Sequence, residues 1–148
     1  MAEKEKKQSE AGLQLIGIEL LNSSLQLPPL QGTILSNFSF DLKVESNVDS
    51  QKKLVFVIVH VEIKTEDLKH VLGTLSLSCI YTIVNFEEVV KVSPEGKITL
   101  PPSLNDLLNS ISISTTRGVM FSTFKGTFIH SAFLPIVDPR AFQQIEKV

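Results

Sequence analysis

The chain has 148 residues, of which 43% are hydrophobic and 20% charged, and its formal net charge is −2. This length and composition fit one globular domain with a hydrophobic core, and the near-neutral charge excludes an electrostatic footprint for nucleic acid or an anionic membrane surface. The single cysteine, Cys79, excludes an intramolecular disulfide and favours a cytoplasmic protein in which this thiol is a small buried side chain.

The N-terminal segment is predicted to be a disordered charged tail over residues 1–11, followed by a single domain over residues 12–148. A charged start before an apolar stretch superficially resembles a signal peptide. However, acidic residues occupy the region that should be positive, namely Glu3, Glu5 and Glu10, and no small-residue cleavage site follows. Since no stretch of about 18 apolar residues occurs, we expect no membrane insertion.

A long first strand is predicted over residues 13–27. Its apolar residues alternate with polar ones, but the alternation changes phase near Gly17 and again near Leu21. Such a change moves the apolar side chains from one face of a sheet to the other, so we expect a bulge or kink within this strand.

An apolar loop follows this strand. The residues that break the strand are Pro28, Pro29 and Gly32. The same segment carries apolar side chains, Leu27, Leu30 and Ile34. Because loops usually run over the surface in contact with water, these side chains must be covered by something or be free to bind something.

Three further strands are predicted over residues 38–45, 54–64 and 72–86. The first alternates apolar and polar residues, which is typical of a strand with one face in water. The second is β-branched and apolar on both faces until His60 and Glu62. The third places its apolar residues on one face: Leu75, Leu77, Cys79, Tyr81 and Ile83. Short polar turns between successive strands favour an antiparallel meander.

A long helix is predicted after a linker over residues 87–102. Ser103 and Asp106 form a capping-box-like start, and the apolar spacing carries the helix to about Lys125. Residues 111–116 are β-branched and serine-rich, so this helix needs tertiary or quaternary packing to be stable. Small residues that would let a second helix approach closely are Ser110, Ser112, Ser114 and Gly118.

A short C-terminal helix is predicted to start at Asp138, as the N-cap, and Pro139, and to continue through Phe142 and Ile145. The order of elements predicts an α+β fold: a four-stranded antiparallel sheet, then a long helix, then the short C-terminal helix.

The search for chemistry finds no catalytic or metal-binding pattern. The three histidines, His60, His70 and His130, lack the spacing of metal ligands, and no phosphate-binding or nucleophile-elbow motif occurs. We expect His60 to be a hydrogen-bonded strand histidine and Arg117 to be a structural donor. The sequence therefore predicts a protein that is not an enzyme and that uses no metal or cofactor.

Aromatic side chains gather near the end of the long helix and beyond it: Phe121, Phe124, Phe128 and Phe133. One interpretation is that they complete the core by holding the helices on the sheet, since burial is the default for phenylalanine. The other is that they join the apolar loop and the last helix in lining a groove for extended apolar segments.

Three sequence runs form an ordered set of motifs: Thr115-Thr116-Arg117-Gly118, Gly126-Thr127-Phe128, and the stretch from Leu134 to Phe142, which reads Leu-Pro-Ile-Val-Asp-Pro-Arg-Ala-Phe. This set resembles the SecB-like chaperones. Upstream, Ile80 to Ile83 and Leu13 to Leu15 resemble the fourth and first strands of that family. The resemblance implies a cytoplasmic, ATP-independent holdase that binds unfolded or precursor polypeptides for protein export.

The same resemblance implies an assembly and a binding site. Family members are homotetramers, built as dimers of dimers with the long helices at the centre, which places Ser110, Ser114 and Gly118 at the oligomer interface. The peptide-binding residues that it implies are Leu27, Leu30, Ile34, Phe38, Phe133, Phe142 and Ile145.

Two departures from the family pattern leave the partner open. Export chaperones dock onto the translocase motor ATPase through acidic side chains, whereas the corresponding positions here are Asn22, Gln26 and Thr74. The chain also has no tryptophan for the crossover loop. A dedicated client, such as the antitoxin of a toxin–antitoxin pair, is therefore an alternative within the family, and a carrier of a small apolar ligand is an alternative outside it.

Overall fold

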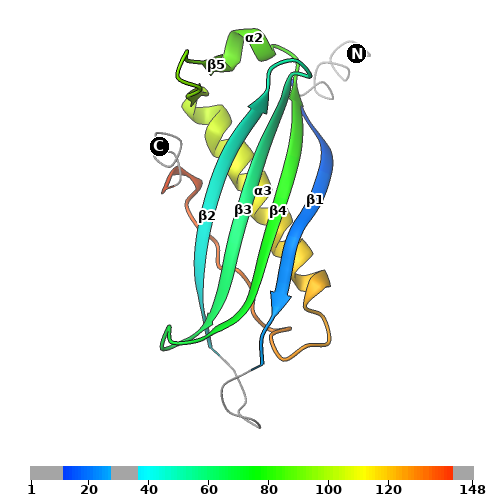
Figure 1. Ribbon diagram of the computed structural model, residues 1–148, viewed down its shortest axis with the longest axis vertical. Helices are drawn as coiled ribbons and strands as arrows, with labels where there is room; N and C mark the ends of the chain where they lie inside the picture. Colours follow the sequence, from blue (N-terminus) through cyan, green and yellow to red (C-terminus); the bar gives the residue numbers. More distant parts are fainter. Residues whose placement is uncertain (1–11, 28–36, 142–148) are drawn as a thin grey trace, which may run out of the picture.

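The computed structural model describes residues 12–27 and 37–141. Its elements are β1 (Leu13–Leu25), β2 (Phe38–Asp49), β3 (Leu54–Thr65), β4 (Val71–Ile83), α2 (Phe86–Val89), β5 (Lys91–Val92), β6 (Ile98–Thr99) and α3 (Pro102–Thr123). The four long strands form one antiparallel sheet, and α3 crosses one face of it diagonally (Figure 1). The predicted four-stranded α+β architecture is confirmed.

The strand order is β1-β4-β3-β2, so β1 and β2 form the two edges. The expected meander is correct for β2, β3 and β4, which pair with their neighbours in the chain. It is wrong for β1, which pairs with β4 instead of β2. β1 and β2 are consecutive strands in the chain but lie at opposite edges of the sheet.

Two irregularities in β1 account for its change of phase. The register with β4 shifts between Leu15 and Gly17 and again between Leu20 and Asn22. Each shift leaves one extra residue, Ile16 or Leu21, which is the geometry of a β-bulge. The predicted bulge is thus present at both positions where the sequence changes phase.

The core lies between α3 and the sheet face that carries the odd-numbered residues of β3 and β4. These side chains are almost completely buried, and they include Val57, Val59, Leu77 and Tyr81. Alternation in β3 and β4 produces this layer because successive strand residues point to opposite faces. Cys79 belongs to the same layer, as expected.

The start of α3 differs from the prediction. The helix begins at Pro102 with Pro101 as N-cap, and no side chain caps it, so the capping box expected at Ser103 is wrong. Proline is well suited to the first helical position because its missing N–H has no partner there. The helix ends at Thr123, close to the expected Lys125.

The segment expected to be a plain linker contains α2 and the β5–β6 pair, so that expectation is also wrong. At the other end, Asp138 accepts a hydrogen bond from the main-chain N–H of Arg140 at 3.0 Å, and a 3₁₀ turn covers residues 139–141. The rest of the predicted C-terminal helix and the predicted tail over residues 1–11 lie outside the described residues.

Candidate functional site

Apolar side chains are exposed where the chain leaves β1 and where it follows α3. Leu27 is 88% exposed and Phe133 is 57% exposed, whereas Phe38 at the start of β2 is half-buried against the core. These are three of the predicted peptide-binding residues. The other four, Leu30, Ile34, Phe142 and Ile145, lie outside the described residues.

The four aromatic residues near the end of α3 separate into two groups. Phe124 is buried and Phe128 packs against the core, so the core interpretation holds for both. Phe121 and Phe133 instead stack on each other at the surface, with ring centroids 6.1 Å apart and an interplanar angle of 17°. Phe121 is 52% exposed. Two exposed stacked phenylalanines form a flat apolar surface that can contact further apolar side chains.

The segment Phe133–Val137, here called the strap, runs back along the helix side of the sheet (Figure 1). Leu134 is buried, whereas Ile136 is 87% exposed. From α3, Arg117 donates hydrogen bonds to the carbonyl oxygens of Leu134 and Pro135, at 2.7 and 2.9 Å. Arg117 is therefore a structural donor, as the sequence predicted.

One stripe of α3 is exposed among the described residues. Ser110, Ser114 and Gly118 are exposed, and a Cβ added at Gly118 would meet no atom within 4 Å among the described residues. Leu107 lies on the same stripe and is also exposed. Ser112 does not belong to this stripe: it is buried, and its hydroxyl is hydrogen bonded to the Tyr81 hydroxyl at 2.7 Å.

Strand β1 exposes many apolar side chains. Leu15, Ile18 and Leu20 pair with residues of the core face of β4 but are themselves exposed. The bulge residues Ile16 and Leu21 are exposed as well. An edge strand of this length also has a row of backbone N–H and C=O groups available for pairing with another strand. The sequence indicated the bulges but not this exposure, because the edge position of β1 depends on contacts that are distant in sequence.

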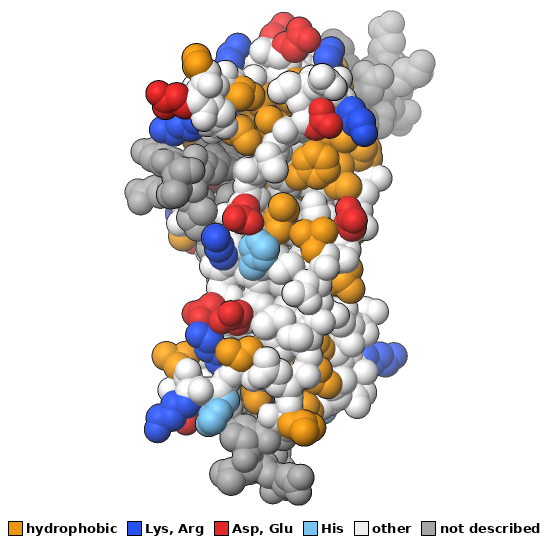
Figure 2. Space-filling model, viewed as in Figure 1, with side chains coloured by type: hydrophobic (Ala, Val, Ile, Leu, Met, Phe, Trp, Pro, Cys, Tyr) orange, Lys and Arg blue, Asp and Glu red, His pale blue; other side chains and the backbone are white. Residues whose placement is uncertain are grey.

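The sheet face that α3 does not cover divides into an apolar and a polar part (Figure 2). Leu54, Phe56, Ile58 and Ile80 share one part of this face and are half-buried. Further along β3, His60 is hydrogen bonded through Nε2 to Glu45 Oε2 and through Nδ1 to Ser76 Oγ, both at 2.7 Å. The expectation that His60 is a hydrogen-bonded strand histidine is confirmed.

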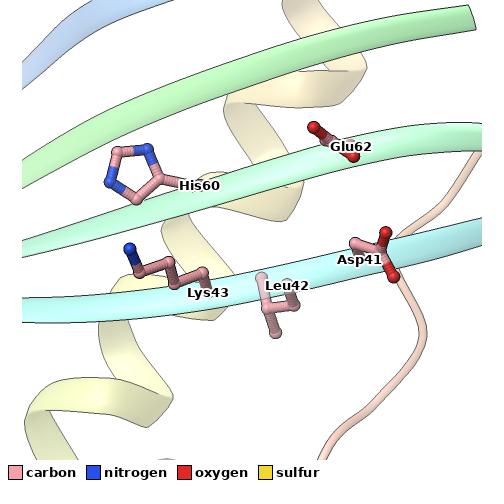
Figure 3. Close-up of a pocket in the computed structure, with 5 residues that line it drawn as sticks. All are labelled: Asp41, Leu42, Lys43, His60 and Glu62. Atoms are coloured by element: carbon pink, nitrogen blue, oxygen red, sulfur yellow. The ribbon is translucent and has the colours of Figure 1, made fainter. Parts of the chain in front are cut away.

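This Ser–His–Glu row has the groups of a nucleophilic triad but not its setting. Ser76 lies in the middle of β4 and pairs with β1 on one side and β3 on the other, so the surrounding backbone N–H groups are engaged in the ladders and cannot bind an oxyanion. A shallow pocket of about 290 Å³ beside the row is lined by Asp41, Leu42, Lys43, His60 and Glu62 (Figure 3). We interpret the row as a solvated cross-strand network.

The electrostatics agree with this interpretation. The hydrogen bond from His60, followed by the charge of Lys43, holds the pKa of Glu45 below its usual range despite partial desolvation. Burial raises the pKa of the Cys79 thiol, which keeps it protonated and unreactive. Burial likewise raises the pKa of Tyr81. Within residues 12–27 and 37–141 no cluster of three or more potential metal ligands occurs, and no helix is long and apolar enough to cross a membrane.

Comparison with known proteins agrees with this description of the fold. No protein-family model matches the sequence, and the search of curated proteins gives no significant match. Among solved structures, the chain is similar to Rv1957 of Mycobacterium tuberculosis, a SecB-like chaperone in complex with a ChAD peptide from the Rv1956 HigA1 antitoxin. The TM-score is 0.52 at 16% sequence identity, and the match covers 84% of this chain and 89% of that chain. The chain therefore has the SecB-like α+β fold.

Proposed function

We propose that this protein is an ATP-independent chaperone, a holdase that binds unfolded or precursor polypeptides in an extended form. The observation that carries the proposal is the exposed stack of Phe121 and Phe133 on a SecB-like fold. A side chain of this size stabilises a protein by burial, at about 25 cal/mol per Å² of apolar surface. Exposed on the free protein, the stack can supply that free energy to a bound apolar segment instead.

The proposed client-contacting residues are those implied by the resemblance: Leu27, Leu30, Ile34, Phe38, Phe133, Phe142 and Ile145. Leu27 and Phe133 support the proposal through their exposure. Phe38 packs partly against the core, so it would form the floor of the site more than its rim. An open apolar surface favours polypeptide binding over a carrier for a small ligand, because a carrier would enclose its ligand in a cavity.

We further propose that the chain assembles through α3, as a cytoplasmic homotetramer built from two dimers. A glycine within a helix costs about 1 kcal/mol relative to alanine. A Cβ added at Gly118 would meet no atom within 4 Å, so nothing among the described residues requires this glycine. Close approach of a helix from another subunit would require it, and Ser110 and Ser114 on the same stripe would leave room for that helix.

The choice of client has two candidates. Rv1957 is described in complex with a peptide from an antitoxin, which favours a dedicated client of that kind here. Delivery of precursors to a translocase motor ATPase is less supported, because Asn22, Gln26 and Thr74 carry no negative charge. In addition, the Thr74 hydroxyl is already hydrogen bonded to Ser24. We therefore favour a restricted set of clients.

The test is suppression of aggregation of a chemically unfolded protein, measured by light scattering without ATP. The wild-type chain should suppress aggregation at about one oligomer per client. Leu27→Ser and Phe133→Ser should weaken suppression while leaving the thermal melt nearly unchanged, because exposed side chains contribute little to the core. Val84→Ser is the matched control, since Val84 is exposed but lies far along the chain from the proposed site.

The alternatives predict different outcomes. If the wild-type chain fails to suppress aggregation at molar excess, general holdase activity is excluded. A dedicated client or a carrier then remains. Native mass spectrometry separates these two, since a carrier would be a monomer with a co-purified ligand, whereas the chaperone would be an oligomer without one.

A further inference from the structure

One side chain of α3 donates hydrogen bonds to the main chain of the strap. Arg117 donates through Nε to the carbonyl oxygen of Leu134 and through Nη2 to the carbonyl oxygen of Pro135. Within the described part of the chain, residues 133–137 take part in no backbone–backbone hydrogen bond. The two bonds from Arg117 therefore link the main chain of the strap to the helix, while the side chains of Leu134 and Val137 pack against the core.

The strap in turn sets the direction of Phe133. Ala132 and Leu134, on either side, are buried in the core, whereas Phe133 points outward and stacks on Phe121. Since neighbouring residues of an extended chain point to opposite sides, a small rotation of the strap would move Phe133 away from Phe121. The orientation of the exposed aromatic pair thus depends on where the carbonyl groups of residues 134 and 135 are held.

Arginine is suited to this task and lysine is not. The planar guanidinium presents several N–H donors in a fixed geometry, and here two of them reach two successive carbonyl oxygens. The ammonium group of lysine is a compact charge on a flexible stem, and it cannot hold both carbonyls in one orientation. Hydrogen bonds from a charged donor are also about twice as strong as neutral ones.

We propose that Arg117 is a positioning residue for client binding: it latches the strap to α3 and so keeps Phe133 in the orientation that meets an apolar client side chain. This inference rests on the proposed chaperone function. Without the latch, the strap populates several positions, and only a fraction of the molecules is competent to bind. The apparent Kd equals the intrinsic Kd divided by the competent fraction. If about one tenth of the molecules is competent, the complex is therefore approximately tenfold weaker.

The first experiment follows the strap itself and needs no client. The chain has no tryptophan, so Phe133→Trp introduces a single fluorescent reporter. Adding Arg117→Ala to this variant should lower the tryptophan anisotropy and increase its quenching by acrylamide, while the far-ultraviolet circular dichroism melt stays cooperative. Unchanged anisotropy and quenching would overturn the latch.

The second experiment measures affinity on the full chain, with a permanently unfolded, reduced and carboxymethylated lactalbumin as the probe. Arg117→Ala and Arg117→Lys should both weaken binding about tenfold, and millimolar methylguanidinium should partly restore binding by Arg117→Ala. Lys125→Ala is the charge-matched control, because this exposed residue lies just after α3 and outside the strap. Equal affinities for wild type and Arg117→Ala would overturn the proposal.

Together, the two experiments distinguish a failure of the proposed chaperone function from a failure of the Arg117 latch. If the wild-type chain does not bind the unfolded probe, the proposed function fails for such clients. The tryptophan measurement still decides whether Arg117 positions Phe133. If the wild-type chain binds but neither measurement responds to Arg117→Ala, the function stands and the latch is wrong.

Discussion

Replacing Gly118 with alanine should have opposite effects on the isolated subunit and on the assembly. A Cβ at this position meets no atom within 4 Å in the described chain, so the methyl group adds no strain within the subunit. The substitution removes the helix penalty of glycine and should stabilise α3 by about 0.8–1.0 kcal/mol. For a chain of this length, that gain corresponds to a rise of about 2–4 °C in the Tm of the dissociated subunit.

In the assembly the same methyl group would lie between two closely packed helices. Crowding a well-packed contact typically costs about 1–3 kcal/mol, which would outweigh the gain in helix propensity. Gly118→Ala should therefore dissociate at higher protein concentrations than wild type, as followed by native mass spectrometry or analytical ultracentrifugation. Ser114→Ala is the control, since it improves helix propensity on the same stripe without adding bulk.

One result would refute the reasoning about this stripe. If Gly118→Ala raises the Tm at every protein concentration and leaves the dissociation constant of the oligomer unchanged, no helix approaches α3 at Gly118. Any association of subunits would then use another surface, and the exposed edge of β1 is one apolar candidate among the described residues.

Three further predictions concern the subunit and can be checked by denaturation. Gly73→Ala should destabilise the fold by about 1–3 kcal/mol, because a Cβ at this position would lie 2.7 Å from Cδ1 of Ile129; urea titration measures the change. Asn109→Leu should stabilise the fold by about 1 kcal/mol in the same assay, because it removes a buried amide that has no hydrogen-bond partner within the described chain. A loss of stability would show that the amide is paired. The hydrogen bond from His60 lowers the pKa of Glu45 in the folded state. Glu45 therefore contributes its full stabilisation above its unfolded pKa of 4.5. This stabilisation is lost as the pH falls through the lower pKa of the folded state. His60→Ala should flatten this acid dependence of the Tm, and an unchanged pH profile would contradict the assignment.

The strands could be predicted from the sequence because their information is local. Residues 54–58 are apolar throughout, and from Val59 onward the apolar residues alternate with His60 and Glu62; the structure buries the valines and keeps His60 and Glu62 on the other face. The two phase changes near Gly17 and Leu21 likewise predicted the bulges of β1, since an extra residue inverts every side chain that follows it. The partner of β1 was wrong, because pairing between strands distant in sequence leaves no periodic signal. Two strand ends also differ from the prediction, since β2 continues to Asp49 and β4 ends at Ile83.

The regions that the prediction missed lack such a signal. β5 and β6 have two residues each, and α2 has four, so none of them is long enough to show a period. At the start of α3, a serine with an aspartate three residues later matches the capping pattern, but the two prolines before Ser103 define the first turn instead. For the site, sequence reasoning identified Phe133 but not its contact with Phe121, because the turn that joins them is irregular.

The two sides of α3 bear on the proposed assembly. A surface helix usually turns its apolar stripe to the core and its polar residues to water. Here Asn105 and Asn109 are buried on the side facing the core, with amide atoms that find no partner in the described chain, whereas Leu107 and Phe121 are exposed. Burial against the sheet alone therefore gives α3 less stabilisation than its apolar residues could provide. A second surface that covers Leu107 and the small residues up to Gly118 would add the missing stabilisation by burial. This supports the proposal that α3 packs against another subunit.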